Sequence, residues 1–488
     1  MVIIMNYRMI SYIIGQMIRV EGILMLPPLA VSMIFREDAL AAFLLPMLIS
    51  VAAGTALTIK KPANTDIFAK EGFVTVGLSW IIMSVVGAIP FVIDGSIPSL
   101  VDAFFETVSG FTTTGASILT SVEDLGKGML FWRSFTHWIG GMGVLVFVLA
   151  ILPQADTRSV KLMHMMRAEV PGPKVGKLVS KIGRTARIMY GIYIVLTLIQ
   201  TVLLLIGGMP LFDSIVNSFA TAGTGGFAIK NASIAAYNSA FVDYVIGIFM
   251  FLFGVNFNLY YLILIGHFKE AVKSEELRWY LIIVGVSTAL ISADIYNIFG
   301  NIGDSIRYAF FQVTSVISTT GFATADYNTW PALSKVILAL LMFCGACAGS
   351  TTGGIKVGRL ILLVKSGLRE IKYMLHPRAI VPVRSDKKPV ENEVLRGASS
   401  FMIVYIMLFT VSFFFLEMVE ECDLVTGFTA VSACLNNVGP GLGEVGPAGN
   451  FSAFTSFTKL LLSFDMLAGR LEIFPLLMIF APSTWRGR

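Results

Sequence analysis

Long apolar runs alternate with short polar stretches along the whole chain. After an apolar N-terminal segment, the runs fall near 39–59, 72–93, 131–153, 186–207, 240–266, 279–299, 333–364, 397–416 and 455–481. A helix of about 20 such residues crosses the roughly 30 Å of hydrocarbon in a bilayer. The pattern predicts an all-α, multi-pass membrane protein in which nearly every segment is a span or a short connection.

The composition agrees with this prediction. Hydrophobic residues make up 56% of the 488 positions and charged residues 14%, whereas soluble globular proteins carry about 25% charged residues. The mean hydropathy is +0.78. Arg8, Arg19 and Glu21 interrupt the N-terminal segment and no small-residue cleavage site follows it. We therefore expect a retained, partly interfacial helix that pairs with the helix near 39–59, and not a signal peptide.

Basic residues gather in two connecting segments. The first contains Arg158, Lys161, Arg167, Lys174, Lys177, Lys181, Arg184 and Arg187, and the second contains Lys365, Arg369, Lys372, Arg378, Arg384, Lys387, Lys388 and Arg396. Loops rich in Lys and Arg stay on the cytoplasmic side of a membrane, so both segments are predicted to be cytoplasmic. A peripheral lipid-binding patch is a compatible alternative. The net charge of +5 is thus no indication of nucleic-acid binding.

A short motif recurs four times between the apolar runs. In each copy a Phe-rich or small-residue stretch leads into a polar loop centred on glycine. The loops are Thr112-Thr113-Thr114-Gly115, Thr224-Gly225-Gly226, Ser318-Thr319-Thr320-Gly321 and Asn436-Asn437-Val438-Gly439. The first and third copies share a Phe-Phe pair and a final Thr-Thr-Gly, which is too much agreement for chance. The second is aligned through Gly226, because the pair Gly226-Phe227 matches Gly321-Phe322.

The stretch before each loop is too short and too polar to cross a membrane. It predicts a half-helix that enters and stops, so the repeated unit is span, half-helix, re-entrant loop, span. The predicted divisions are 1–71 for an N-terminal helix pair, 72–153 for repeat 1, 154–268 for a cytoplasmic loop with repeat 2, 269–367 for repeat 3, and 368–488 for a cytoplasmic loop with repeat 4. Because each unit crosses twice, all four loops enter from the face opposite the basic segments.

Four re-entrant loops on one chain predict a pore. Irregular backbone at membrane depth is tolerated only where it is buried in protein or lines a watery cavity, and a pseudo-fourfold ring satisfies this for all four loops together. Glycine allows successive carbonyl oxygens to face one axis, where they can replace the water shell of an alkali cation. The C-terminal ends of the half-helices add partial negative charge. For any single loop, an ordinary Gly- and Thr-rich turn between spans is the alternative.

Below the loops, two features interrupt the apolar pattern. Residues 345–354 are predicted to be a break in the helix, since each interior glycine lowers helix stability by about 1 kcal/mol relative to alanine. The alternative is that these small residues let membrane helices pack closely. Cys344 and Cys347 have a C-x-x-C spacing, but we interpret them as small packing residues in a membrane helix. Arg470 lies mid-span, where a charge costs at least ~2.5–3.5 kcal/mol, so it should face water or the bundle interior. Its alternative role is an ion pair with Asp465 or Glu472.

Acidic residues collect on the predicted outer side. They are Asp94, Asp102, Glu106, Glu420, Glu421, Asp423 and Glu444. Such charges either concentrate cations at the mouth of a pore or are ordinary solvated loop residues. Glu106 lies within a half-helix, where we expect it to brace the first loop. His137 is expected to be a hydrogen-bonded structural residue and not a proton carrier.

These motifs resemble the Trk/Ktr/HKT superfamily of potassium transporters, and within it the Trk pore subunits. Residues 109–117, 133–143, 349–356 and 466–475 carry the resemblance, which covers essentially the whole chain. The extra N-terminal segments also resemble the Trk branch. The resemblance implies a bacterial cytoplasmic membrane protein that takes up potassium, with K⁺ as the transported ion at the filter carbonyls and no cofactor on this chain.

In that superfamily one glycine per filter marks potassium-preferring members, and the matching positions here are Gly115, Gly226, Gly321 and Gly439. The fourth loop departs from the pattern, because amides replace hydroxyls at Asn436 and Asn437. The resemblance further implies that an intramembrane loop under the filter acts as a gate. The predicted gate residues are Gly345, Gly349, Ser350, Thr351, Thr352, Gly353, Gly354 and Arg470. We therefore expect nearly fourfold selection above and gating by the last two repeats below.

The resemblance also implies partners, namely a second copy in a homodimer and a cytosolic nucleotide-binding ring of the TrkA type on the basic face. No G-x-x-x-x-G-K-[ST] motif is present, and neither is a Ser/His/Asp set or an H-E-x-x-H motif. An enzyme is therefore not expected. The leading prediction is a channel-like pore driven by membrane potential. A secondary transporter that couples the cation to protons or sodium, and a less selective K⁺/Na⁺ pore, are the alternatives.

Overall fold

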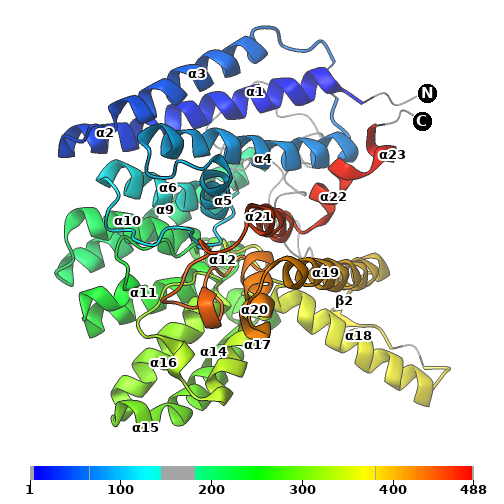
Figure 1. The fold of residues 1–488 in the computed structure, drawn as a ribbon. Helices are drawn as coiled ribbons and strands as arrows, with labels where there is room; N and C mark the ends of the chain where they lie inside the picture. The colour runs from blue at the N-terminus through cyan, green and yellow to red at the C-terminus, as the bar shows by residue number, and fades with distance from the viewer. Residues whose placement is uncertain (1–4, 65, 144–181, 380, 486–488) are drawn as a thin grey trace.

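The computed structural model describes residues 5–64, 66–143, 182–379 and 381–485, and these are mostly helical (Figure 1). The N-terminal part contains α1 (Tyr7–Leu24), α2 (Leu26–Phe35) and α3 (Leu40–Thr58). The stretch predicted as the first repeat contains α4 (Ala69–Asp94), α5 (Leu100–Phe111) and α6 (Lys127–Gly141), and the other predicted repeats are named in the same way below. The second contains α9 (Ile182–Ile206), α10 (Leu211–Gly223), the 3-10 turn η1 (Ser233–Tyr237), α11 (Ala240–Phe253) and α12 (Phe257–Leu264), followed by α13 (Phe268–Val272).

The third repeat contains α14 (Glu275–Asp294), α15 (Tyr296–Phe299), α16 (Ile302–Ile317), η2 (Tyr327–Thr329), α17 (Ala332–Cys344) and α18 (Val357–Leu375). A small hairpin of β1 (Arg384–Ser385) and β2 (Lys388–Pro389) then pairs antiparallel. The fourth repeat contains α19 (Asn392–Val419), α20 (Leu424–Leu435), η3 (Gly443–Val445), α21 (Ser456–Arg470), α22 (Phe474–Phe480) and α23 (Pro482–Trp485). The boundaries predicted at 71 and 367 fall inside α4 and α18.

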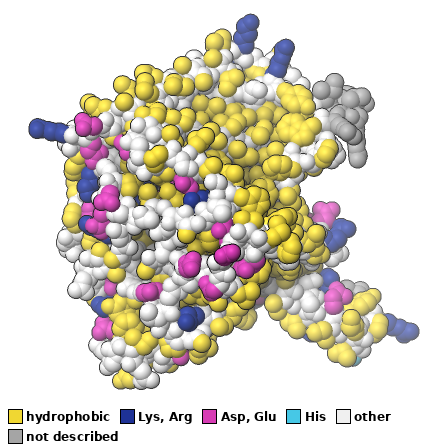
Figure 2. Space-filling view, in the orientation of Figure 1, with side chains coloured by type: hydrophobic (Ala, Val, Ile, Leu, Met, Phe, Trp, Pro, Cys, Tyr) yellow, Lys and Arg dark blue, Asp and Glu magenta, His cyan; other side chains and the backbone are white. Residues whose placement is uncertain are grey.

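Six helical segments of the described residues are long and apolar enough to cross a membrane. They are Tyr7–Phe35, α3, α4, Arg187–Ile206, α14 and α19, and the bent pair α11–α12 would make a seventh. The N-terminal segment, predicted to be partly interfacial, is thus long enough to span. Hydrophobic side chains cover the surface along α1, α3 and α4, and charged side chains gather near the two ends of these helices (Figure 2).

The helices α1 and α3 lie side by side along their length (Figure 1). Glycines make this close approach possible: a Cβ built on Gly54 would lie 2.7 Å from the backbone nitrogen of Arg19, and one on Gly22 would meet Ser50 and Val51 at 3.0 Å. Small residues at such contacts are the usual means by which membrane helices pack closely. The pair is therefore a tightly packed unit against α4.

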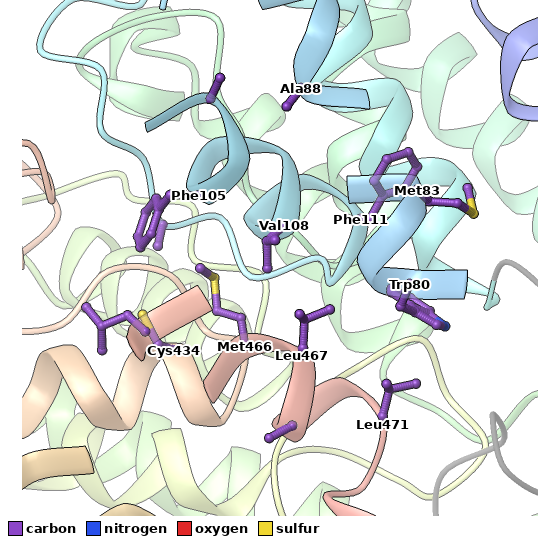
Figure 3. Packing of buried hydrophobic residues seen from close by; sticks show 14 of the residues in the cluster. Trp80, Met83, Ala88, Phe105, Val108, Phe111, Cys434, Met466, Leu467 and Leu471 are labelled. Atoms are coloured by element: carbon purple, nitrogen blue, oxygen red, sulfur yellow. The ribbon is translucent and has the colours of Figure 1, made fainter. Parts of the chain in front are cut away.

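The short helices that precede the loops are buried in protein. On α5, Phe105, Val108 and Phe111 lie between α4 and α21, where they face Trp80 and Met466 (Figure 3). Ser99 caps the N-terminus of α5, and Asp423 caps that of α20. Capping satisfies the first backbone N–H groups of each helix, which have no partner within the helix, at the exposed ends where α5 and α20 begin. The parts of these helices that lead into the loops are thus enclosed by protein, while the helices begin at exposed residues.

In each repeat the span that follows the loop was predicted to be continuous, except in repeat 3, where a break was expected. The structure shows breaks in repeats 2 and 4 as well. The run 240–266 is two helices that meet at 90°, and the run 455–481 is interrupted at 471–473 between α21 and α22. Two local signals explain these breaks. The side chain of Asn256 caps α12, and Pro475 in the first turn of α22 lacks the N–H that a continuing helix needs. Of the run 131–153, residues beyond 143 lie outside the described residues.

The helix α18 and the hairpin β1–β2 project from the body of the molecule (Figure 1). Together they carry part of the second basic segment, including Lys365, Arg369 and Lys372 on α18. The start of α1 and the helix α23 lie close together at one side, where the ring of Tyr7 stacks on that of Trp485. Most of the first basic segment falls outside the described residues.

Candidate functional site

The four predicted loops share one backbone conformation. The residue two places before each loop glycine has a left-handed φ, with values of 56° at Thr113, 55° at Thr224, 54° at Thr319 and 55° at Asn437. The glycines Gly115, Gly226, Gly321 and Gly439 have φ values of 83°, 75°, 86° and 94°. A left-handed φ costs an L-residue about 1–2 kcal/mol. Four equivalent strained positions persist only because the surrounding structure imposes them, which is typical of functional sites.

Each half-helix also ends in the same hydrogen bond. The N–H of the residue before the glycine donates to a carbonyl five residues earlier. The bonds are Thr114 to Ser109 at 2.9 Å, Gly225 to Ala220 at 2.9 Å, Thr320 to Ser315 at 2.8 Å and Val438 to Ala433 at 2.8 Å. This is a Schellman-type ending, in which glycine usually occupies the left-handed position; here threonine or asparagine does. The bond turns the N–H groups back into the helices and leaves the loop carbonyls for other partners.

The loops form a closed ring. A Cβ built on each loop glycine would overlap the carbonyl oxygen of the next loop. The pairs are Gly115 with Gly225, Gly226 with Thr320, Gly321 with Val438, and Gly439 with Thr114. The four carbonyls belong to the residue before each glycine, so every loop touches its neighbours through equivalent atoms. Glycine is therefore sterically required at all four positions, and Gly226 is the ring glycine of the second loop, in agreement with the alignment.

Side chains make the ring unequal. In the first loop the hydroxyls of Thr112 and Thr114 lie 2.8 Å apart, and in the third loop those of Ser318 and Thr320 lie 2.7 Å apart. The second loop has glycine at the position of Thr114 and Thr320. Local hydroxyl pairs thus stiffen two of the four loops.

In the fourth loop the amides reach outward to neighbouring elements. The Nδ2 of Asn437 donates to the Thr114 hydroxyl and to the Met466 carbonyl, each at 2.9 Å. The hydroxyl of Tyr405 donates to Oδ1 of Asn436 at 2.9 Å. These amides therefore link the fourth loop to the first loop, α19 and α21. The sequence had shown only that amides replace hydroxyls here, and it gave no indication that they hold the loop in position.

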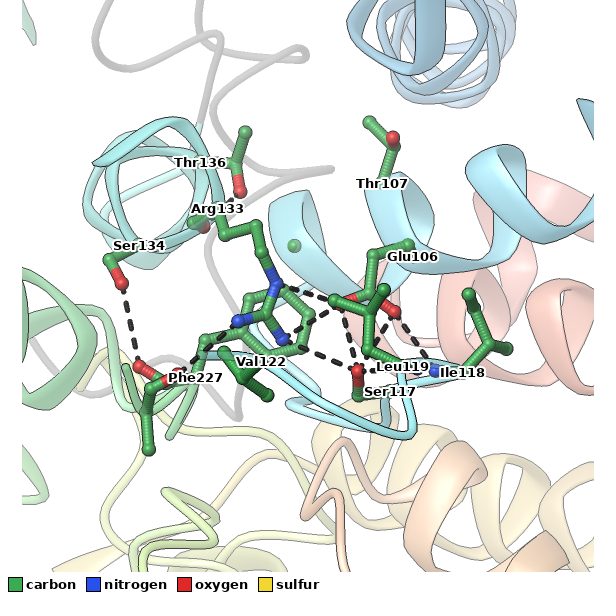
Figure 4. A network of polar contacts seen from close by, with 12 residues as sticks. Glu106, Thr107, Ser117, Ile118, Leu119, Val122, Arg133, Ser134, Thr136 and Phe227 are labelled. Carbon is green, nitrogen blue, oxygen red and sulfur yellow. Dashed lines mark hydrogen bonds and ion pairs between the residues drawn. The ribbon is translucent and has the colours of Figure 1, made fainter. Parts of the chain in front are cut away.

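A buried ion pair braces the first loop. The carboxylate of Glu106 on α5 contacts the guanidinium of Arg133 on α6 at 2.8 Å, and both side chains are buried. The same carboxylate accepts hydrogen bonds from the Ser117 hydroxyl at 3.0 Å and the Ile118 N–H at 3.0 Å (Figure 4). Arg133 also lies over the ring of Phe227, which follows the second loop. Glu106 thus braces the chain leaving the first loop, as expected.

His137 joins the first and second loops. Its Nδ1 lies 2.7 Å from the carbonyl of Gly110, and its Nε2 lies 3.2 Å from the backbone N of Phe227. A carbonyl only accepts and an N–H only donates, so the neutral ring with a proton on Nδ1 satisfies both contacts. A second proton on Nε2 would face the Phe227 N–H. This geometry agrees with the structural role predicted for His137.

The irregular stretch 345–356, here called the gate segment, lies directly below the third and fourth loops. The N–H of Gly353 donates to the Thr319 hydroxyl at 2.8 Å, and a Cβ on Gly353 would overlap the Asn436 carbonyl. The segment also contacts the bend between α11 and α12, where Cys347 N–H donates to Gly254 at 3.0 Å. Cys347 therefore lies in the irregular segment, and the prediction that it belongs to a membrane helix was wrong.

Arg470 connects the gate segment to the first repeat. Its guanidinium donates to the carbonyls of Thr351 at 2.6 Å, Gly140 at 2.5 Å and Gly141 at 2.7 Å. Among the described residues, the two alternative partners pair elsewhere. Asp465 accepts a hydrogen bond from Ser412 at 2.8 Å, and Glu472 pairs with Arg359 at 3.0 Å. Arg470 is thus buried among backbone carbonyls, at the point where α21, α6 and the gate segment meet.

The predicted outer acidic residues have mostly structural contacts. Asp102 pairs with Lys459 at 2.7 Å, Glu420 accepts from the backbone and hydroxyl of Thr455, and Asp423 caps α20. Two further residues near the gate segment had not been singled out. Lys356 is buried and donates to Thr352, and Glu276 accepts hydrogen bonds from Ala348 near the start of the segment and from Gly358 just after its end. Lys356 closes the Gly-Gly-Ile-Lys motif, but no pattern in the sequence pointed to Glu276.

Comparisons with known proteins agree with this architecture. Residues 39–486 match the TrkH family, described as a cation transport protein. The chain is 37% identical to the Trk system potassium uptake protein TrkH of Salmonella typhimurium and 36% identical to that of Escherichia coli K12, with 99% of this chain and 100% of each relative covered. It also superposes on the crystal structure of the potassium transporter TrkH from Vibrio parahaemolyticus with a TM-score of 0.88, at 32% identity and with 99% and 100% of the two chains covered. The chain belongs to the TrkH family of cation transport proteins.

Proposed function

We propose that this chain takes up potassium across the bacterial cytoplasmic membrane by conducting it through the ring of four loops. The observation that carries the proposal is the closed ring itself, in which four identically folded loops bring equivalent carbonyls together around one centre. The relatives named above are potassium uptake proteins of Trk systems, which supports the choice of ion.

In this proposal the backbone of the loops is the selectivity filter. The carbonyls of Thr114, Gly225, Thr320 and Val438 replace the hydration shell of K⁺, which is the transported substrate. The left-handed residues and the helix-end hydrogen bonds hold these oxygens in place, so the ring keeps its size when the ion enters. The other residues of the four loops support these carbonyls and set the width of the ring. Inward movement is driven by the membrane potential, which is worth ~2.3 kcal/mol per charge per 100 mV.

The lower obstruction in this proposal consists of the gate segment and Arg470. The segment lies under two of the four loops, and the positive charge of Arg470 disfavours a cation beside it. Because Arg470 also bonds to Gly140 and Gly141, opening requires these contacts to rearrange. Coupled transport with protons or sodium is the alternative. Both ring nitrogens of His137 are occupied by hydrogen bonds to the backbone, so this residue gives no support to a proton-coupled mechanism.

The Trk system named for the relatives implies further components for those proteins. We include in the proposal a homodimer and a cytosolic nucleotide-binding ring docked on the basic segments. The mass of the detergent-solubilised chain, alone and with such a ring, tests this part separately.

The test of conduction is ion uptake into vesicles that contain the purified chain. Rubidium, as a potassium substitute, is expected to enter faster than sodium, and Gly115→Ser is expected to narrow the difference by crowding the Gly225 carbonyl. Gly191→Ser is the matched control, since nothing lies within 4 Å of a Cβ built on Gly191. Equal uptake of both ions by the unsubstituted chain, or no uptake, would contradict the proposal. Uptake that requires an opposing proton or sodium gradient would favour the coupled alternative.

A further inference from the structure

Both ends of the gate segment meet at one carboxylate oxygen. The Oε1 of Glu276 accepts a hydrogen bond from the Ala348 N–H at 2.8 Å and from the Gly358 N–H at 2.9 Å. Ala348 lies near the start of the segment, and Gly358 lies in the first turn of α18, just after its end. Glu276 itself belongs to the first turn of α14. A single side chain from a neighbouring helix thus joins the start of the gate segment to the residue that follows its end.

The segment has little regular structure of its own to do this. Between α17 and α18 it contains Gly345, Gly349 and Gly354, all with positive φ, and flexible glycine backbone is costly to order. Two backbone hydrogen bonds also join the start of the segment to its end: the Ile355 N–H donates to the Phe343 carbonyl at 3.2 Å, and the Val357 N–H donates to the Ala346 carbonyl at 3.0 Å. Two charge-assisted hydrogen bonds to one carboxylate are a substantial addition to this small set.

The same turn of α14 also contacts the projecting cytoplasmic part. Glu275 pairs with Lys365 of α18 at 2.5 Å, and its N–H donates to Asp386 of the hairpin at 2.7 Å. Lys365 also donates to the Arg384 carbonyl at 2.7 Å. Adjacent residues of one helical turn therefore hold the gate segment and the hairpin. A displacement of the hairpin or α18 changes the distance between Gly358 and Glu276.

We propose that Glu276 is a positioning residue of the gate, which keeps the gate segment under the loops until the hairpin 384–389 and α18 are moved from the cytoplasmic side. The proposal rests on the proposed function, because a held segment regulates flux only if ions pass the loops. Glu276 acts here through the backbone of Ala348 and Gly358 and does not contact the ion.

The test compares Glu276→Ala with Glu276→Gln in vesicles without any cytosolic partner. The alanine variant loses both charge-assisted hydrogen bonds to the backbone, and we expect rubidium leak to rise about tenfold. The glutamine carbonyl still accepts both N–H groups, so its leak is expected to stay within about twofold of the unsubstituted chain. Glu270→Ala is the control, since Glu270 is an exposed glutamate on α13 that pairs only with His267 among the described residues.

Amide hydrogen exchange of residues 345–358 provides a readout that does not depend on flux. Exchange is expected to accelerate in Glu276→Ala and to be unchanged in Glu276→Gln. Folded Glu276→Ala protein with unchanged or reduced leak overturns the gating role, and unchanged exchange overturns the clamp itself. If Glu276→Ala does not fold, Glu276→Asp, whose shorter side chain cannot reach both N–H groups, must leak more than both the unsubstituted chain and Glu276→Gln, and an equal leak overturns the gating role. Loss of rubidium selectivity in the unsubstituted chain would instead count against the proposed function.

Discussion

The ring of loops and the layer below it are built on opposite principles. In the ring, four segments with different side chains adopt the same φ values and the same helix-end hydrogen bonds. Below the ring, the second spans of the described repeats differ: α11 and α12 bend by 90°, α17 and α18 are separated by the gate segment, and α21 is followed by a break at 471–473. The backbone of the ring is nearly symmetric although its side chains differ, whereas the backbone below the ring differs from repeat to repeat and single side chains such as Arg470 and Glu276 hold it.

The lower layer receives contacts from more of the chain than the prediction about gating named. Gating was predicted to depend on the last two repeats. The gate segment and Arg470 do belong to these repeats, but Arg470 bonds to Gly140 and Gly141 of the first repeat, and Cys347 bonds to Gly254 of the second. All four repeats therefore contribute contacts to the layer below the ring.

The largest expected effect comes from breaking the ring. Gly226→Ala places a methyl group against the Thr320 carbonyl and a side chain at a φ of 75°. We expect rubidium uptake to fall by about 100-fold, because the carbonyl must move and left-handed alanine adds about 1–2 kcal/mol. Gly191→Ala, on an open helix face, serves as the control. Normal uptake by Gly226→Ala would show that the ring does not need its close contacts.

A smaller effect is expected from the lower layer. Arg470→Gln removes the charge and most of the bonds that join α21 to the gate segment and α6. We expect leak without a cytosolic partner to rise about tenfold, with the ratio of rubidium to sodium uptake unchanged. Arg278→Gln, at an exposed arginine on α14, is the control. A changed ion ratio would mean that the two layers are not separable, and unchanged leak would exclude Arg470 from the obstruction.

The smallest effect is expected from making the ring more symmetric. Asn437→Thr gives the fourth loop the residue found at Thr113 and Thr319 but loses the amide bonds to Thr114 and Met466. Threonine is less tolerant of the left-handed φ of 55° than asparagine. We expect a decrease of a few degrees in melting temperature, since about 1 kcal/mol shifts even a domain of about 150–250 residues by only ~2–4 °C, and a less than tenfold change in ion ratio. A strictly unchanged melting temperature would mean that the amide bonds are dispensable.

The roles of several residues could be predicted from the sequence. The Gly-Phe pairs correctly identified Gly226 as the ring glycine, and the position of Glu106 within a half-helix correctly suggested a brace. The position of Arg470 in an apolar run predicted that its side chain faces water or the interior of the bundle, and the structure places it in the interior. Its actual partners were not predictable, because backbone carbonyls of Thr351, Gly140 and Gly141 carry no sequence signal. The homodimer, the cytosolic ring and the repeat boundaries stay predictions.

The sequence by itself determined the membrane class, the fourfold repetition of loops and the glycine positions, because hydrophobic period and glycine placement are local properties of the chain. Only the tertiary structure decided which carbonyl each glycine faces, where the second spans bend, and that Glu276 and Arg470 hold the gate segment from different sides. These contacts join residues far apart along the chain through backbone atoms that every residue possesses. Their partners are therefore set by the packing of the repeats, and not by the identity of the residues contacted.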